Sequence, residues 1–203
     1  LPPTHKMIEV GKRSLERLES EYKEALEQKS GLRRWFGQSK AVGKNGEPLV
    51  LYHGTSNDFS IFRRKQDGRA LWAADQATAN TYAGESTGSN VMPVLMSMQN
   101  PLEVDAEGST WQNLRFEGDR LGADSSAEIA EERGFDGLII RNLRDFDTDD
   151  GGDSPADHFA VFKPAQIKSA TGNRGTFDPA NPDIRFSIAD AVEQIKQFDV
   201  KTA

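Results

Sequence analysis

The chain has 203 residues, a formal net charge of -7 and no cysteine, a size that allows one domain with an appended segment. The lack of cysteine excludes disulfides, thiolate nucleophiles and cysteine metal sites, and it fits a reducing compartment, so that a cytoplasmic location is expected. The acidic balance argues against broad attraction to nucleic acid or anionic membrane, and no apolar run is long enough to span a membrane.

Residues 8–28 have the pattern of an amphipathic helix. Apolar side chains recur at helical or heptad spacing, and Glu19 stands four residues before Lys23. The helix has three candidate roles: packing on the main domain, pairing with another chain, or ending a preceding domain. The chain begins without an initiator methionine. We therefore expect a piece of a longer polyprotein or multidomain chain, with residues 1–32 as an N-terminal helical segment.

Two short strands and a helix are predicted next. Residues 43–48 are rich in turn-forming residues, and the apolar run 49–52 predicts a buried strand that ends at His53. A second apolar run at 70–74 predicts another strand, after which Asp75 is expected to cap a helix. Because that helix directly follows the strand, Trp72 and Tyr82 are expected to lie within reach of one cleft.

The sequence pattern of the second half of the chain predicts more strands than helices. A strand is predicted at 91–98, and Pro93 indicates either that this strand lies at a sheet edge or that the proline lies early in the strand. A helix near 127–133 is expected to stop at Gly134, and a last helix is expected near 188–198. The acidic loop 145–155 lacks the glycine and glutamate positions of a calcium loop, so we expect a solvated loop. Two further strands are predicted at 137–140 and 158–162.

These elements indicate an α+β domain built on an antiparallel or mixed sheet. Several short strands occur with few helices, and the regular alternation of strands and helices that a parallel sheet requires is absent. A Rossmann fold is disfavoured, because no G-x-G-x-x-G motif joins a strand to a helix.

Three segments resemble one enzyme family. Residues 35–55, with Tyr52-His53-Gly54-Thr55, resemble the opening of the ADP-ribosyltransferase domains of phage polyvalent proteins and related bacterial toxins. Residues 70–75 with Tyr82 are similar to the second motif of the histidine-tyrosine-glutamate superfamily, which includes diphtheria toxin and the poly(ADP-ribose) polymerases. Residues 166–178 resemble the C-terminal stretch of the polyvalent-protein subset. The resemblance covers 33–187 and implies a split antiparallel or mixed sheet with short helices, which leaves 188–203 as a C-terminal helix or tail.

The resemblance implies that the chain uses NAD as a substrate and breaks the bond between nicotinamide and ribose. His53 would then bind hydroxyls of the nicotinamide-side or the adenine-side ribose, as a neutral imidazole can. Gly54 would let the carboxamide approach the main chain, and Thr55 completes this segment of the NAD-binding set. Trp72 and Tyr82 would flank the nicotinamide ring. No metal is expected, because the three histidines of the chain lack ligand spacing.

The third catalytic residue departs from the family pattern. Polymerase-like members place a glutamate at the start of the corresponding strand, whereas alignment back from Gln166 places His158 there, with Asp157 beside it. Asp157 serves only if the register slips by one residue, which turns a side chain to the other face. In order of preference the candidates are Asp157, Gln166, His158 and Asp153, and the first two join His53 and Tyr82 as the predicted catalytic residues.

The missing glutamate favours transfer of a single ADP-ribose over polymer synthesis. The expected function is mono-ADP-ribosylation of a macromolecule, either protein or RNA or DNA, by a phage or bacterial effector or toxin. This effector would act in the bacterial cytoplasm after delivery by phage or secretion, without a membrane partner. Two alternatives stay open: an NAD glycohydrolase with water as the acceptor, and an inactive NAD-binding or interaction module of a larger polyvalent protein.

Overall fold

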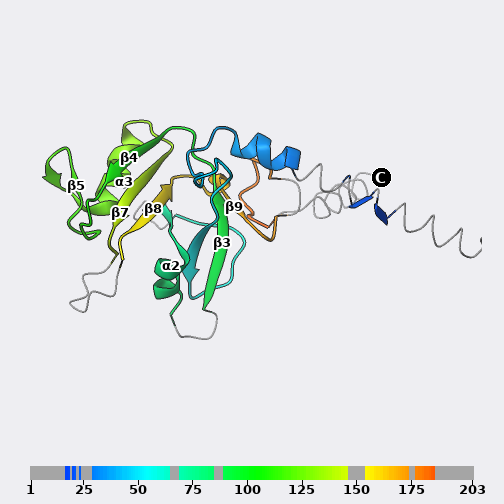
Figure 1. Cartoon of the computed structure of the whole chain (residues 1–203), viewed down its shortest axis with the longest axis horizontal. Helices are drawn as coiled ribbons and strands as arrows, with labels where there is room; N and C mark the ends of the chain where they lie inside the picture. Colours follow the sequence, from blue (N-terminus) through cyan, green and yellow to red (C-terminus); the bar gives the residue numbers. More distant parts are fainter. Residues whose placement is uncertain are drawn as a thin grey trace, which may run out of the picture.

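The computed structural model describes residues 17, 18, 20, 21, 23, 29–64, 69–84, 89–145, 154–173 and 177–185. These residues form two main β-sheets and a small hairpin, with short helices against the sheets (Figure 1). The strand order is β1-β3-β9 in the first sheet and β2-β8-β7-β4 in the second. The predicted α+β class, with its split and mixed sheet, is therefore confirmed.

Three antiparallel strands form the first sheet: β1 (Leu51–Thr55), β3 (Asn90–Met96) and β9 (Ile167–Ser169). β3 lies in the centre, so an edge position for Pro93 is wrong, although this proline does lie in the first half of its strand. Its missing N–H is tolerated because the ladder with β9 begins only at Val94. On the other side Pro93 faces Tyr52, whose backbone bonds to Ala74 instead.

β1 differs from its predicted extent. The strand begins at Leu51 and continues through Thr55, so that His53 lies in its middle and not at its end. The extension follows from the partner strand, because β3 pairs with Gly54 and Thr55 through Val91 and Asn90. Pairing partners supplied by a distant segment could not be deduced from the local apolar run.

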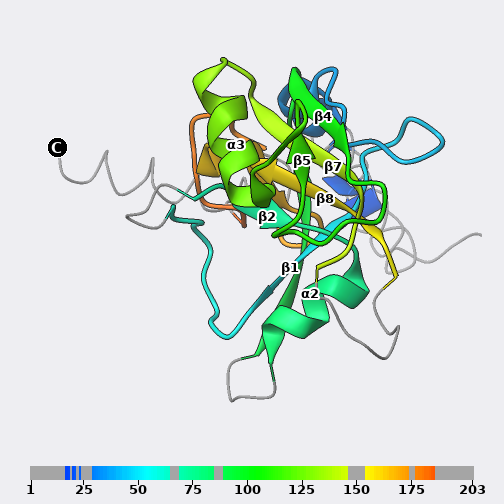
Figure 2. The ribbon, with the colours of Figure 1, turned by 90° about the vertical axis from the view of Figure 1, so that its left-hand side faces the viewer.

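Four strands form the second sheet: β2 (Leu71–Ala73), β4 (Pro101–Asp105), β7 (Gly137–Leu143) and β8 (Ala156–Val161). β4 and β7 are parallel, and the other neighbours are antiparallel. Helix α3 (Gly122–Glu132) covers one face and buries Ala123, Ala127 and Ala130 against the strands (Figure 2). The strands predicted near 70–74, 137–140 and 158–162 and the helix near 127–133 are thus present, with shifted ends.

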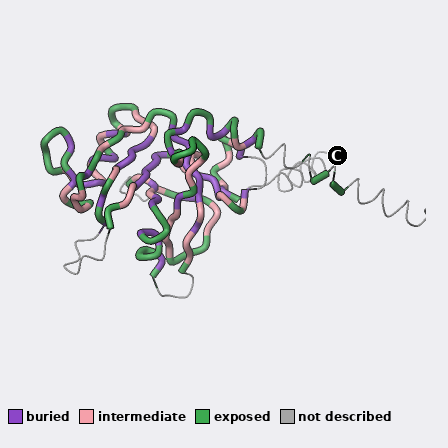
Figure 3. Tube along the Cα trace, in the orientation of Figure 1, coloured by how far each residue is buried: buried purple, intermediate pink, exposed green. Residues whose placement is uncertain are grey.

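The two sheets meet where β1 passes β2. Tyr52 and Ala74 exchange two backbone hydrogen bonds of 2.9 and 3.0 Å. One apolar core spans the junction, since Leu51 and Val94 of the first sheet pack with Ile139 of the second. Figure 3 shows that the buried residues follow the strands. The backbone around His53 is therefore held in place by contacts with both sheets.

Helix α2 (Gln76–Ala83) packs on β1 and β3 (Figures 1 and 2). The Asp75 side chain accepts a hydrogen bond of 2.8 Å from the backbone N–H of Thr78, so the predicted cap is confirmed. Helix α2 follows β2 after two residues, and it therefore carries Tyr82 to the same side of the junction as Trp72.

The remaining described elements are short. Residues 29–36 are helical, and Trp35 and Phe36 pack with Leu95 and Phe177. The predicted helix near 188–198 and most of the helix 8–28 lie outside the described residues, as does the acidic loop from 146 to 153. No helix among the described residues is long and apolar enough to cross a membrane. The other elements are β5 (Arg115–Phe116), β6 (Asp119–Arg120) and the 3-10 helix η1 (Pro164–Gln166).

Candidate functional site

A cavity of about 940 Å³ lies at the junction of the two sheets. Its walls come from β1 and β2, from α2, from the loop 59–63, and from the second sheet with the segments beside it. A cavity lined by several separate elements of a fold is the usual form of a ligand site. Its polar and aromatic lining includes His53, Trp72, Tyr82, Trp111, Asp145 and His158.

His53 points into this cavity from the middle of β1. Its Nδ1 lies 2.9 Å from the carbonyl oxygen of Trp72, and since a carbonyl only accepts, the proton is on Nδ1. The Nε2 atom then carries a lone pair that can accept a hydrogen bond from a ligand hydroxyl. The rings of Phe59 and Phe62 contact the imidazole edge to face, with centroids 6.1 and 4.9 Å away. His53 is thus oriented by backbone and by packing.

Burial lowers the pKa of His53 below 6.5, and the hydrogen bond to the Trp72 carbonyl offsets this only in part. The neutral imidazole therefore stabilises the fold fully above pH 6.5. As the pH falls from 6.5 towards the lowered pKa, the unfolded chain takes up a proton that the folded chain does not, and stability is lost. We expect the melting temperature of the wild type to fall more steeply over this interval than that of His53→Gln. Equal slopes in thermal melts would contradict this.

Trp72 and Tyr82 supply the aromatic surface of the cavity. Trp72 lies on β2 and is half-buried, because one side of it packs against the core beneath α3. Tyr82 lies on α2 with 54% of its surface exposed, and its hydroxyl donates a hydrogen bond of 2.8 Å to Oδ1 of Asp145. The Tyr82 ring is therefore held at its hydroxyl end while it lines the cavity.

Gly54 and Thr55 have different environments. Gly54 lines the cavity and also lies directly under α2, since a Cβ at this position would overlap the carbonyl oxygen of Ala79. Thr55 does not line the cavity, and its hydroxyl accepts a hydrogen bond from the backbone of Asn57. The structure thus gives Gly54 a packing role in addition to the predicted ligand contact, and it places Thr55 at the border of the site.

The alternation of β8 separates two of the candidates for the third catalytic residue. His158 lines the cavity, whereas the neighbouring Asp157 does not. Asp157 accepts hydrogen bonds from Arg141 at 2.6 Å and from the backbone of Asn142 at 3.2 Å. Successive side chains of a strand point to opposite faces, so only one of the two can reach the cavity in the observed register.

Gln166 lies outside the cavity, and its amide is bonded within the protein. Its Oε1 accepts from the backbone N–H groups of Phe162 and Lys163, while its Nε2 donates to the carbonyl oxygens of Ser97 and Asp136. These contacts close the turn between β8 and β9. Asp153, the remaining candidate, lies outside the described residues.

Asp145 is a pocket residue that the sequence reasoning did not select. It follows β7, is 5% exposed, lines the cavity and binds the hydroxyl of Tyr82. One local signal could have found it, because an acidic residue right after a buried strand is well placed to face a cleft at the strand end. Because Asp145 also begins the acidic loop 145–155, the sequence pattern assigns it to that solvated loop and not to a cleft.

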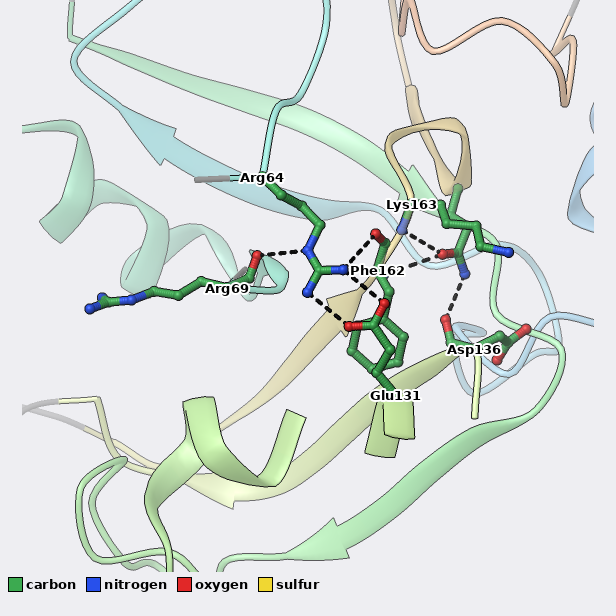
Figure 4. A network of polar contacts seen from close by, with 7 residues as sticks. Arg64, Arg69, Glu131, Asp136, Phe162 and Lys163 are labelled. Atoms are coloured by element: carbon green, nitrogen blue, oxygen red, sulfur yellow. Dashed lines mark hydrogen bonds and ion pairs between the residues drawn. The ribbon is translucent and has the colours of Figure 1, made fainter. Parts of the chain in front are cut away.

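An ion pair holds one wall of the cavity. Arg64 donates two hydrogen bonds of 2.8 Å to the carboxylate of Glu131 on α3, and also bonds to the carbonyl oxygens of Arg69 and Phe162 (Figure 4). Arg63, next to Arg64 in the chain, and Arg69, whose carbonyl oxygen accepts from Arg64, both line the cavity. Arg69 lies 3.7 Å from Asp124, which is also a wall residue.

The described part of the chain contains no group of three or more His, Cys, Asp or Glu side chains that could hold a metal ion. The cavity lining includes the imidazoles of His53 and His158, aromatic rings such as those of Trp72 and Tyr82, and the carboxylates of Asp124 and Asp145. This combination suits a flat, cationic ring with a hydroxyl-bearing sugar attached.

A split, mixed sheet with short helices is the arrangement that the resemblance to ADP-ribosyltransferases predicts, and the described residues form it. Residues 43–177 match the family described as ADP-Ribosyltransferase in polyvalent proteins, which is more than half of the chain. The chain therefore belongs to this family, and the family predicted from the sequence is confirmed. No curated protein and no solved structure gave a significant match.

Proposed function

We propose that the chain cleaves NAD between nicotinamide and ribose and transfers a single ADP-ribose to a macromolecule. The observation that carries the proposal is the convergence of His53, Trp72 and Tyr82 from three elements on one cavity. Its volume of about 940 Å³ lies near the upper end of the usual range for ligand pockets, about 300–1,000 Å³, which suits a dinucleotide.

In this proposal the residues act on different parts of NAD. The rings of Trp72 and Tyr82 flank the nicotinamide, which is cationic until the bond breaks. His53 Nε2 accepts a hydrogen bond from a ribose hydroxyl, and Arg63 and Arg69 at the rim face the negative phosphates. The glycosidic electron pair leaves with nicotinamide, which becomes neutral, and the ribose takes the positive charge. The acceptor atom then bonds to the anomeric carbon and releases its proton to solvent.

The acceptor in this proposal is a side chain of a protein or a group of RNA or DNA. Membership of this family supports the proposal that the chain is one domain of a longer polyvalent protein. We further propose that it acts as a phage or bacterial effector in the bacterial cytoplasm. A neutral imidazole at His53 suits a reaction that runs near neutral pH.

The test is nicotinamide release from NAD by the purified chain, alone and with bacterial lysate, with labelled ADP-ribose followed into protein and RNA fractions. We expect His53→Ala to lower the rate about 100-fold or more, since it removes a positioned polar contact. Tyr82→Ala is expected to raise KM about tenfold through lost stacking. Thr81→Ala, on the exposed side of α2 and not among the residues that line the cavity, is the control and is expected to keep the wild-type rate.

The outcomes separate the three activities. Label in one macromolecular fraction supports the transferase and names the class of acceptor. Release of nicotinamide without any transfer indicates a glycohydrolase. Binding of NAD without release, by a chain that melts cooperatively, contradicts both enzymatic functions and indicates an inactive NAD-binding module.

A further inference from the structure

We infer that His158 is the general base of the transfer step, and that the acceptor reacts through a hydroxyl group. In this role His158 Nε2 takes the proton from the oxygen that attacks the ribose. The inference rests on the proposed function and deepens it, because it adds a catalytic residue and restricts the acceptor. A carboxylate has no proton to lose, and a lysine or arginine side chain is a cation without a free lone pair. A hydroxyl group is therefore the acceptor that an imidazole base serves.

The environment of His158 leaves one ring nitrogen free for this task. Its Nδ1 lies 3.2 Å from the carbonyl oxygen of Ala156, and since a carbonyl only accepts, the proton is on Nδ1. Nε2 therefore carries a lone pair. The side chain is 7% exposed and lines the cavity, and Nε2 makes no hydrogen bond to the residues that the structure describes. A buried acceptor without a donor is costly, so this nitrogen indicates that a bound molecule supplies the donor.

The second sheet places His158 beside the part of NAD that reacts. Trp72 of β2 pairs with Ala160 of β8, and His158 lies two residues from Ala160 on the same strand. Side chains two residues apart on a strand share a face, so His158 and Trp72 are on the same side of the sheet. In the proposed function the ring of Trp72 flanks the nicotinamide. His158 therefore lies near the bond that breaks.

Other groups that line the cavity suit the role of base less well. At neutral pH an imidazole is a stronger base than a carboxylate, which disfavours Asp124 and Asp145. Asp124 also has Arg69 at 3.7 Å. His53 is an imidazole too, but its burial disfavours the charged form that a base becomes, and its Nε2 contacts a ribose hydroxyl in the proposed function. His158 is thus the remaining imidazole of the cavity.

The step balances with NAD, the acceptor and His158 alone. The bond between the anomeric carbon and the nicotinamide nitrogen breaks, and its electron pair stays on that nitrogen. The acceptor oxygen bonds to the anomeric carbon, and its proton moves to His158 Nε2. The imidazolium that results gives this proton to solvent when the product leaves, which restores the neutral imidazole.

The first arm of the experiment separates proton removal from hydrogen bonding. In His158→Gln the amide oxygen still accepts a hydrogen bond, but it does not take a proton at neutral pH. We measure nicotinamide release by the full chain, with bacterial lysate where the wild type requires it. We expect kcat to fall about 100-fold, with a melting temperature near that of the wild type and an NAD Kd within about threefold. Intrinsic tryptophan fluorescence follows NAD binding.

The second arm supplies a nucleophile that needs no base. Azide is an anion, so it can attack the anomeric carbon without losing a proton. We expect sodium azide to raise the rate of His158→Ala about tenfold or more and to yield ADP-ribosyl azide in the mass spectrum, whereas sodium chloride at the same concentration has no such effect. His53→Ala is the matched control, because it also removes one imidazole from the cavity, and azide is expected to leave its rate low.

The third arm tests the chemical class of the acceptor. Labelled macromolecules are treated with neutral hydroxylamine, which cleaves the ester that a carboxylate would form and leaves the glycoside of a hydroxyl intact. We expect the label to resist this treatment.

The outcomes separate the inference from the proposed function. A wild type that releases nicotinamide, with His158→Gln keeping about a third or more of its kcat, would overturn the base role and leave the function standing. Failure of azide to raise the rate of His158→Ala, or an equal rise in His53→Ala, would overturn the base role as well. Label that hydroxylamine removes would overturn the hydroxyl class. A wild type that binds NAD but releases nothing would overturn both the inference and the function.

Discussion

Replacing Gly54 with alanine is expected to displace α2 and destabilise the whole junction. A Cβ at this position would overlap the carbonyl oxygen of Ala79 and lie 2.9 Å from the Cβ of Tyr82. Backbone atoms of a packed helix cannot yield as the end of a flexible side chain does, so we expect a loss of about 3 kcal/mol or more in the free energy of unfolding. This corresponds to a melting temperature about 10 °C lower. Because α2 carries Tyr82, NAD affinity is expected to fall as well.

Gly43→Ala is the matched control for this change. Gly43 lies in the turn before β1, and its nearest neighbours to an added Cβ are 3.9 and 4.0 Å away. The same added methyl group should therefore leave the melting temperature within about 2 °C of the wild type. If Gly54→Ala melted as the wild type does, the close packing of α2 on β1 would be wrong.

The local elements of this fold could be predicted because their signals are local. Asp75 precedes a helix whose first N–H groups need an acceptor, and the short apolar runs of β2 and β7 match buried strands. The end of β1 could not be predicted in the same way, because the pairing of Thr55 depends on Asn90. The central position of β3 in its sheet could not be predicted either, because Pro93 favours an edge strand unless the neighbouring strand is short.

The site residues that belong to sequence motifs could be predicted, whereas those brought together from distant segments could not. His53, Gly54, Trp72 and Tyr82 come from two motifs, and all four line the cavity. The third catalytic position depends on the face of β8, which only the observed register assigns. It turns His158 inward and Asp157 towards Arg141. Asp145 follows β7 and bonds to Tyr82 of α2, and its one local signal, an acidic residue after a buried strand, does not show which distant element it meets.

Residues 177–185, here called the C-terminal strap, connect the core to a wall of the cavity. The backbone N–H of Ser169 on β9 donates to Ile184, and Ile184 in turn donates to the carbonyl oxygen of Ser60 at 2.7 Å. Phe59 and Phe62 lie beside Ser60 and contact the ring of His53. The strap therefore positions His53 indirectly, although it is far from that residue in the sequence.

Lys168→Ala is expected to loosen this strap and to weaken both stability and NAD binding. Lys168 is fully buried on β9, and its Nζ donates to the carbonyl oxygen of Asn181. Burial lowers the pKa of Lys168, while the charges of Asp178 and Asp183 oppose that shift. Alanine leaves a cavity and an unpaired carbonyl, so we expect a loss of about 2–4 kcal/mol in the free energy of unfolding. The Phe59 wall should then hold His53 less firmly.

Arg185→Ala separates this buried anchor from an exposed one in the same strap. Arg185 pairs with Asp58, but both side chains are largely exposed, and exposed ion pairs contribute little because water and salt screen them. Urea unfolding and NAD titration should therefore show a large change for Lys168→Ala and almost none for Arg185→Ala. Equal behaviour of the two variants would mean that the strap does not support the cavity wall. A stability loss in Lys168→Ala with unchanged NAD affinity would show that the strap serves the core alone.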